Sequence, residues 1–123
     1  MAKNLKRKTF VYKSYFWDFY NEQTIQVQDK IDWTIELIRT LEFVPEKYFS
    51  HMTGTDGIFE MRITSGSDIY RIFCCFDEGN LIILFNGFQK KTQKTPPQEI
   101  ERVKRIQKEY YADKRSNKLD FMG

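Results

Sequence analysis

The sequence predicts a single α+β domain, in which an N-terminal strand and helices precede a three-strand antiparallel meander and a C-terminal helix. Two stretches, Thr24–Glu42 and the segment after Pro97, have the amphipathic spacing of helices that bury one face. Between them, three apolar runs follow one another with only short polar turns, which is typical of an antiparallel meander. A length of 123 residues suits one domain with a modest core.

The N-terminal part is predicted to form a strand and a short helix. Lys8–Tyr15 is rich in β-forming residues, and Phe16, Phe19 and Tyr20 follow at the i, i+3, i+4 spacing of a helix face. Aromatic side chains beside basic residues can also stack on nucleobases. The spacing is that of a buried stripe, so packing is the favoured interpretation.

Thr24–Glu42 is the clearest predicted helix. Its apolar stripe consists of Val27, Ile31, Ile35 and Ile38, widened by Leu37 and Leu41. We expect Thr24 or Asn21 to cap its start, and Pro45 to end the region, because the residue before proline resists helical dihedral angles. A loop is expected over Pro45–Thr55.

Three strands are expected to form the meander, at Ile58–Thr64, Ile69–Phe76 and Leu81–Phe88. Alternation places Glu60 and Arg62 on one face of the first strand, and Arg71 with Phe73 on one face of the second. A turn with glycine is expected at Asp77–Asn80. The third run is continuously apolar, as expected of a strand that is buried on both faces.

The last helix is expected to begin at the pair Pro96 and Pro97, because proline is favoured in the first turn. Its apolar stripe consists of Ile100, Val103, Ile106 and Tyr110. Residues 114–123 are polar and end in glycine, so we expect a flexible tail there and a domain that spans residues 1–113.

Charge is segregated along the chain, although the formal net charge is only +3. Residues 1–13 carry five basic and no acidic side chains. Residues 14–87 carry five basic and twelve acidic side chains, and residues 88–118 carry ten basic and four acidic ones. Two basic ends around an acidic middle suit a polyanion or an acidic protein partner. Charge runs also simply solvate helices, so the segregation alone does not decide between these interpretations.

Cys74 and Cys75 are adjacent within an apolar run, so on a strand they point to opposite faces and an ordinary disulfide between them is not expected. We interpret them as buried small side chains in a reducing compartment. No apolar stretch approaches the ~18 residues of a membrane span, and no signal-peptide core follows the basic start. A cytoplasmic protein without a membrane partner is expected. His51 is the single histidine and lacks partners at metal-ligand spacing, so a metal site is not expected. No cofactor is expected.

Three motifs resemble those of one protein family in both content and order. They are GIFEMRI at 57–63, YRIF at 70–73 and FQKKTQKTP at 88–96. They are similar to the G-x-x-E-L-R strand, the Y-R strand and the F-x-K-K-T-x-K-T-P segment of HigB-like toxins in the RelE/ParE superfamily. The resemblance covers about Gly57–Tyr111, its lysine-rich motif is the most specific, and it implies a RelE-like fold.

This resemblance implies a toxin of a type II toxin–antitoxin system that arrests growth. The implied activity is that of an mRNA interferase, an endoribonuclease that cleaves messenger RNA in the A site of the ribosome. The implied inhibitor is a cognate antitoxin, a helix-turn-helix DNA-binding protein. Two alternatives stay open: a ParE-like toxin that inhibits DNA gyrase, and a non-catalytic module that binds RNA or the antitoxin. The lysine-rich motif favours RNA, because ParE-like relatives lack it.

RNA can be cleaved without a metal when its 2′-hydroxyl attacks the adjacent phosphate, which requires a base, cations and a proton donor. Arg62 and Arg71 match basic strand positions of the family and are expected to bind phosphate and stabilise the transition state, since guanidinium is permanently charged and bidentate. Lys90 and Lys91 match its lysine pair, and one of them is expected to transfer protons with a pKa lowered by neighbouring cations. Glu60 either acts as the base or orients Arg62.

Four further residues are candidates for contacts with RNA: Lys94, Phe88, Gln93 and His51. Lys94 is expected to bind phosphate, and Phe88 and Gln93 to hold a base or the backbone. His51 either acts as an acid or base or is merely solvated. Some toxins of the superfamily have a tyrosine or histidine in the C-terminal catalytic region, whereas residues 92–96 here contain neither.

Overall fold

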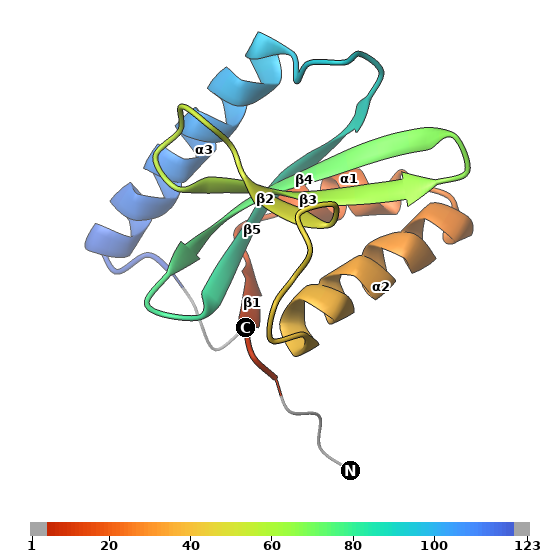
Figure 1. Cartoon of the computed structure of the whole chain (residues 1–123). Coiled ribbons are helices and arrows are strands. Elements are labelled where there is room, and N and C mark those ends of the chain that lie inside the picture. Colours follow the sequence, from red (N-terminus) through yellow and green to blue (C-terminus); the bar gives the residue numbers. More distant parts are fainter. Residues whose placement is uncertain (1–4, 120–123) are drawn as a thin grey trace.

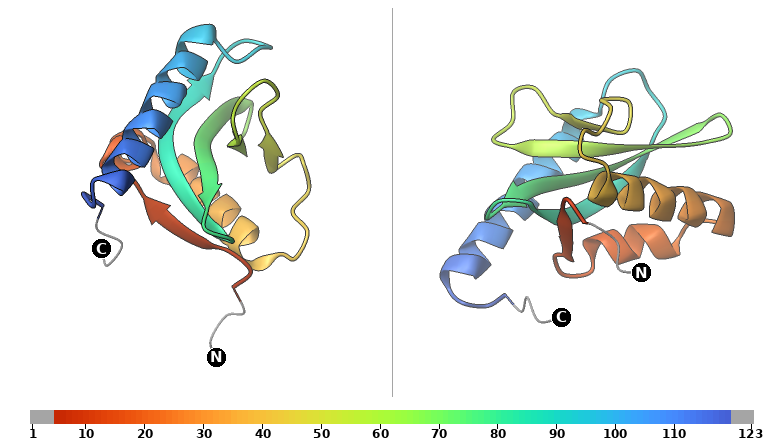
Figure 2. Two further views of the ribbon diagram at one scale, coloured as in Figure 1. Left: turned by 90° about the vertical axis from the view of Figure 1, so that its left-hand side faces the viewer. Right: turned by 60° about the horizontal axis from the view of Figure 1, so that its bottom comes forward.

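In the computed structural model, which describes residues 5–119, a five-stranded sheet separates two helices from a third. In chain order the elements are β1 (Lys8–Val11), α1 (Tyr15–Asn21), α2 (Ile25–Thr40), β2 (Phe49–His51), β3 (Ile58–Ser65), β4 (Asp68–Asp77), β5 (Leu81–Lys90) and α3 (Pro97–Arg115). Helices α1 and α2 lie on one face of the sheet and α3 on the other (Figures 1 and 2). The predicted α+β class is confirmed, and the arrangement is compatible with a RelE-like fold.

The strand order is β1-β5-β4-β3-β2, with β1 parallel to β5 and the other neighbours antiparallel. β2 was not predicted from the sequence. Within the expected loop over Pro45–Thr55, the residues Phe49–His51 pair with Phe59–Met61 of β3. A strand of three residues is too short to show alternation, so its pattern did not distinguish it from a loop.

The sheet has a hydrophobic core on each face. The core against α1 and α2 includes Phe16, Phe19, Val27, Ile31, Ile38, Met61, Ile63, Tyr70, Ile72, Cys74, Ile82 and Leu84. The core under α3 includes Tyr12, Ile58, Phe73, Cys75, Ile83, Phe85, Val103, Ile106 and Tyr110. Each side of the sheet thus buries large apolar side chains, and the burial of each one stabilises the fold by about 1.5–3 kcal/mol. The central strands are therefore a stable support for polar groups.

The predicted helix starts are confirmed. Thr24 Oγ1 accepts a hydrogen bond from Val27 N at 3.3 Å and caps α2, and α3 has Pro97 in its first turn. The end of α3 lies beyond the expected domain boundary at residue 113. Lys114 is helical, and its Nζ lies 2.8 Å from Asp77 Oδ2. The expected tail therefore does not begin at residue 114, and its last part, residues 120–123, lies outside the described residues.

A β-bulge in β5 controls which way the last residues of this strand point. Before the bulge, Cys74 of β4 pairs with Leu84, whereas beyond it Ile72 pairs with Gly87, so two residues of β5 oppose one of β4. The extra residue reverses the alternation of side chains along the strand. Beyond the bulge, the even-numbered residues of β5 therefore face α3.

Cys74 and Cys75 are free, buried and placed in the two different cores, as predicted. Burial raises the pKa of both thiols, that of Cys75 to about 11, so neither is a thiolate at neutral pH. Between residues 5 and 119, no helix has both the length and the apolar character that a membrane crossing requires.

Gly87 lies beneath Phe19 of α1, and a Cβ atom at this position would lie 2.5 Å from Phe19 Cδ2. We predict that Gly87→Ala lowers the free energy of unfolding by about 1–3 kcal/mol, because the added methyl group overpacks the core. Urea unfolding followed by far-ultraviolet circular dichroism measures this loss. In Phe19→Leu/Gly87→Ala the loss should be smaller than the sum of the two single losses. Additive losses would contradict the steric explanation.

Candidate functional site

Three cations from three adjacent strands lie on the α3 side of the sheet. Arg62 of β3 lies directly opposite Arg71 of β4, which in turn lies opposite Phe88 of β5. Lys90 lies opposite Ile69 and is therefore on the same face. Directly opposed Cβ atoms are ~4.5–5.5 Å apart and diagonal neighbours ~7–8 Å, so Arg62 and Arg71 are adjacent and Lys90 is a diagonal neighbour of Arg71. We call Arg62, Arg71 and Lys90 the cationic notch.

Glu60 connects the two arginines of the cationic notch. Its side chain is buried, and Oε1 accepts hydrogen bonds from Arg62 Nη2 at 3.1 Å and Nε at 3.3 Å. The same oxygen lies 3.8 Å from Arg71 Nε. Without this carboxylate, two like charges would face each other directly, an arrangement that destabilises a sheet. Of the two roles left open for Glu60, the contacts favour orientation of the arginine over that of a base.

Burial sets the protonation behaviour of the notch. The Arg71 side chain is 10% exposed, and its Nη1 donates to Tyr70 O at 3.1 Å. Burial lowers the pKa of Arg71, and the charge of Arg62 lowers it further, whereas the charge of Glu60 raises it. The guanidinium nevertheless remains charged near neutral pH. Burial, followed by the charge of Arg71, also lowers the pKa of Lys90, whereas Glu60 raises it. Lys90 is therefore the group in the notch whose proton is most easily lost.

A surface depression of about 570 Å³ lies beside the notch, between the end of β5 and the β3–β4 turn. Its lining residues are Ser67, Asp68, Ile69, Gln89, Lys90, Lys91, Thr92 and Gln93. Lys90 thus belongs to both the notch and the depression, while Lys91 and Gln93 line the depression alone. Lys94 is exposed in the following loop, where its backbone carbonyl accepts the Thr92 hydroxyl at 2.7 Å.

Two of the predicted RNA contacts have other surroundings. Phe88 stacks on Phe73 with ring centroids 5.4 Å apart, so one face of its ring is covered. His51 lies opposite Phe59, its ring 5.3 Å from the Phe59 ring, which packs against the core under α1 and α2. The structure therefore places His51 on the opposite face of the sheet from the notch. No group of three or more His, Cys, Asp or Glu side chains within residues 5–119 is arranged to hold a metal ion.

A family model matches residues 18–108, most of the chain, and describes phage-derived Gp49-like proteins (DUF891). The chain belongs to the Gp49-like family. This is a toxin-like family of toxin–antitoxin systems, which suggests an antitoxin as partner. The matched segment includes the whole cationic notch and Glu60. A comparison with curated proteins gave no match.

The bulge is the feature of this Gp49-like site that sequence reasoning missed. Asn86 lies in the bulge with 1% of its surface exposed, and neither Oδ1 nor Nδ2 has a hydrogen-bond partner among the described residues. The available signal was the dipeptide of Asn86 and Gly87 inside an apolar run, since glycine within a strand marks a bulge or a close approach of backbone. The hairpin residues that line the depression, such as Asp68, carried no comparable signal.

We predict that Glu60→Gln lowers the pKa of Lys90 further, because the substitution removes the negative charge that raises it. Nuclear magnetic resonance titration of the lysine side chains measures this pKa directly. Glu22→Gln removes the same charge from an exposed position just after α1, and serves as the matched control. An unchanged Lys90 pKa in Glu60→Gln, or an equal shift in the control, would contradict the placement of Lys90 beside Glu60.

Proposed function

We propose that this Gp49-like protein is the toxin of a type II toxin–antitoxin system and a ribosome-dependent endoribonuclease that cleaves messenger RNA in the A site. The observation that carries the proposal is the convergence of Arg62, Arg71 and Lys90 on one face of the sheet. Membership of a toxin-like family supports it, as does the order of the three motifs that resemble those of HigB-like toxins. A cognate antitoxin is the proposed inhibitor.

The charges of the site suit the transition state of phosphodiester cleavage. With Lys90 neutral, Arg62 and Arg71 against the carboxylate of Glu60 leave an excess of one positive charge, and the excess becomes two once Lys90 has accepted the proton of the 2′-hydroxyl. A phosphodiester carries one negative charge, and the phosphorane formed by attack on it carries two. The excess of two is therefore better matched to the transition state than to the substrate, which is the condition for catalysis. The half-exposed Arg62 reaches the phosphate from the solvent side, and the buried Arg71 reaches it from the sheet.

In the proposed reaction, the 2′-oxygen of one ribose forms a bond to the adjacent phosphorus. The bond from this phosphorus to the 5′-oxygen of the next nucleotide breaks, which leaves a 2′,3′-cyclic phosphate and a 5′-hydroxyl end. The proton of the 2′-hydroxyl passes to a base, and the departing 5′-oxygen gains a proton from an acid. This proposed route is independent of a metal ion.

We assign proton transfer to Lys90. Because its pKa is lowered, it is neutral more often than an ordinary lysine and can accept the proton of the 2′-hydroxyl. Lys91, Gln93 and Lys94 are assigned to RNA binding, since they lie outside the notch at the depression or in the loop that follows. Glu60 is assigned as a positioning residue that holds Arg62.

Expression of the protein should arrest growth, and Arg62→Ala and Lys90→Ala should relieve the arrest. Loss of one group that stabilises the transition state lowers the cleavage rate about 10²–10³-fold. Arg71 is buried, so the milder Arg71→Gln is used, with circular dichroism to verify its fold. Cleavage is mapped on messenger RNA bound to translating ribosomes. Lys30→Ala removes the same charge from α2, on the other side of the sheet, and should retain full activity.

Two results would oppose this assignment. A parent protein that leaves growth unaffected, or variants as toxic as the parent, would exclude catalysis by the notch. Toxicity with gyrase inhibition and without RNA cleavage would instead place the chain with ParE-like toxins.

The pH dependence of cleavage tests the role of Lys90 as base. The rate should rise with pH until Lys90 is deprotonated and then level off. In Glu60→Gln the cleavage rate should fall at every pH, because Arg62 is no longer oriented. The rising limb of the pH–rate profile should move to lower pH, because the pKa of Lys90 is lower in this variant. Lys90→Arg should abolish the limb, since guanidinium stays protonated. A limb that keeps its position in Glu60→Gln would rule out Lys90 as the base.

A further inference from the structure

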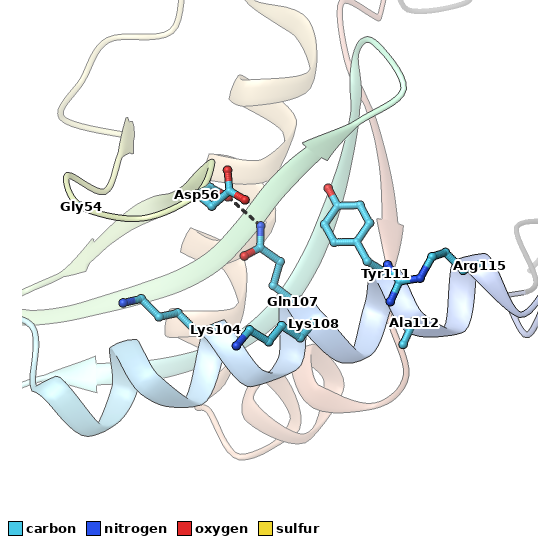
Figure 3. Close-up of a pocket in the computed structure, with 8 residues that line it drawn as sticks. All are labelled: Gly54, Asp56, Lys104, Gln107, Lys108, Tyr111, Ala112 and Arg115. Carbon is cyan, nitrogen blue, oxygen red and sulfur yellow. Dashed lines mark hydrogen bonds between the residues drawn. The ribbon is translucent and has the colours of Figure 1, made fainter.

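A cavity of about 710 Å³ lies between α3 and the loop that joins β2 to β3 (Figure 3). Residues that line it include Asp56, Lys104, Gln107, Lys108, Tyr111 and Arg115. Gln107 Nε2 donates a hydrogen bond to the backbone carbonyl of Asp56 at 2.8 Å. This bond attaches the loop to the helix, so the cavity has two connected walls.

Cations predominate among the charged groups of this cavity. Lys104, Lys108 and Arg115 line it against the carboxylate of Asp56. Lys104 Nζ lies 3.9 Å from the exposed Glu101, and within residues 5–119 neither Lys108 nor Arg115 has an acidic partner. Lys104 and Lys108 are one helical turn apart, ~6 Å along the axis of α3. The cavity therefore presents a row of positive charge to an extended anion.

Tyr111 forms an aromatic wall of the same cavity. Its ring packs edge-on against the buried Tyr110 at 5.1 Å between centroids, and its hydroxyl lies 3.9 Å from Cys75 Sγ. The orientation of the ring is thus determined by the core beneath it. Cations combined with a fixed aromatic ring are the means by which proteins bind single-stranded nucleic acid without reading its sequence.

The cavity and the cationic notch lie on the same side of the sheet and are connected by β3. Asp56 precedes β3, and Arg62 lies six residues further along the chain, which corresponds to roughly 20 Å of extended strand. A stacked nucleic acid strand advances ~3.4 Å per nucleotide, so about six nucleotides span this distance.

We propose that the cavity is a second RNA subsite, which holds a base against Tyr111 and the flanking phosphates on Lys104, Lys108 and Arg115. The same single strand places its scissile phosphodiester in the notch. This inference rests on the proposed function, and it adds that the substrate is an extended strand rather than a dinucleotide. An acidic protein segment is the competing occupant, which the experiment distinguishes.

The experiment measures binding of two non-cleavable 2′-O-methyl RNAs, a trinucleotide and a dodecamer, by fluorescence anisotropy at several salt concentrations. Lys104→Ala/Lys108→Ala is compared with Arg102→Ala/Arg105→Ala. The second variant removes the same charge from α3, but from residues that line a separate depression with Tyr15. Both variants should keep the fold, because all four side chains are exposed or half-exposed.

We expect Lys104→Ala/Lys108→Ala to weaken dodecamer binding roughly tenfold or more near 0.1 M salt. The slope of log affinity against log salt should decrease by about 1.4, since each phosphate contact to a single strand contributes ~0.7. Trinucleotide binding should be unchanged in this variant, and the control variant should retain most of its affinity for both RNAs.

Equal losses in the two variants, no loss in either, or a parent that does not bind the dodecamer would overturn the inference. The inference would also be overturned if a glutamate-rich peptide bound the cavity and lost affinity in Lys104→Ala/Lys108→Ala while RNA did not. A parent that binds as expected but cleaves no RNA on ribosomes would contradict the proposed nuclease and leave the subsite intact. A parent that cleaves RNA and loses no affinity in Lys104→Ala/Lys108→Ala would contradict the subsite alone.

Discussion

The candidate site depends on one constraint, the reversal of side-chain alternation at the bulge in β5. Successive residues of a strand point to opposite faces, so a regular β5 would place its odd-numbered residues under α3 along its whole length. The extra residue opposite Phe73 shifts the register by one, and Phe88 and Lys90 therefore join Arg71 on that face. Without the bulge, the ammonium group of Lys90 would lie on the side of α1 and α2, away from the two arginines of the notch.

A site of this kind weakens the sheet that carries it. Arg62 and Arg71 face each other across two strands, and the Glu60 carboxylate that separates them is buried, with one oxygen lacking a hydrogen-bond partner among residues 5–119. The two cores compensate for this, as does the polar contact at the far end of α3, where Asp77 accepts from Tyr110 at 2.7 Å and from Lys114. The contact at Asp77 and the candidate site are thus located at opposite ends of β4.

Sequence patterns predicted the parts of the molecule that depend on regular periodicity. The stripe of α2 and the shared face of Glu60 and Arg62 follow from local spacing, and of the two predicted caps, Thr24 and Asn21, the structure has Thr24. The choice between Lys90 and Lys91 could not follow from it, because alternation cannot be counted across a bulge whose position is unknown. The placement of His51 depends on the pairing of β2 with β3, and a strand of three residues carries too little pattern to predict that pairing.

Glu60 determines more of the site than its single charge suggests. Its hydrogen bonds hold Arg62 in place, its proximity reduces the repulsion between the two guanidinium groups, and its field raises the pKa of Lys90 against burial and the charge of Arg71. If Glu60 were the base, its Oε2, which has no hydrogen-bond partner among residues 5–119, could accept the proton, but this proton would cancel the negative charge that offsets the two guanidinium groups. A carboxylate that stays ionised avoids this conflict. The geometry therefore supports the proposed division of tasks, in which Glu60 organises the cations and Lys90 transfers the proton.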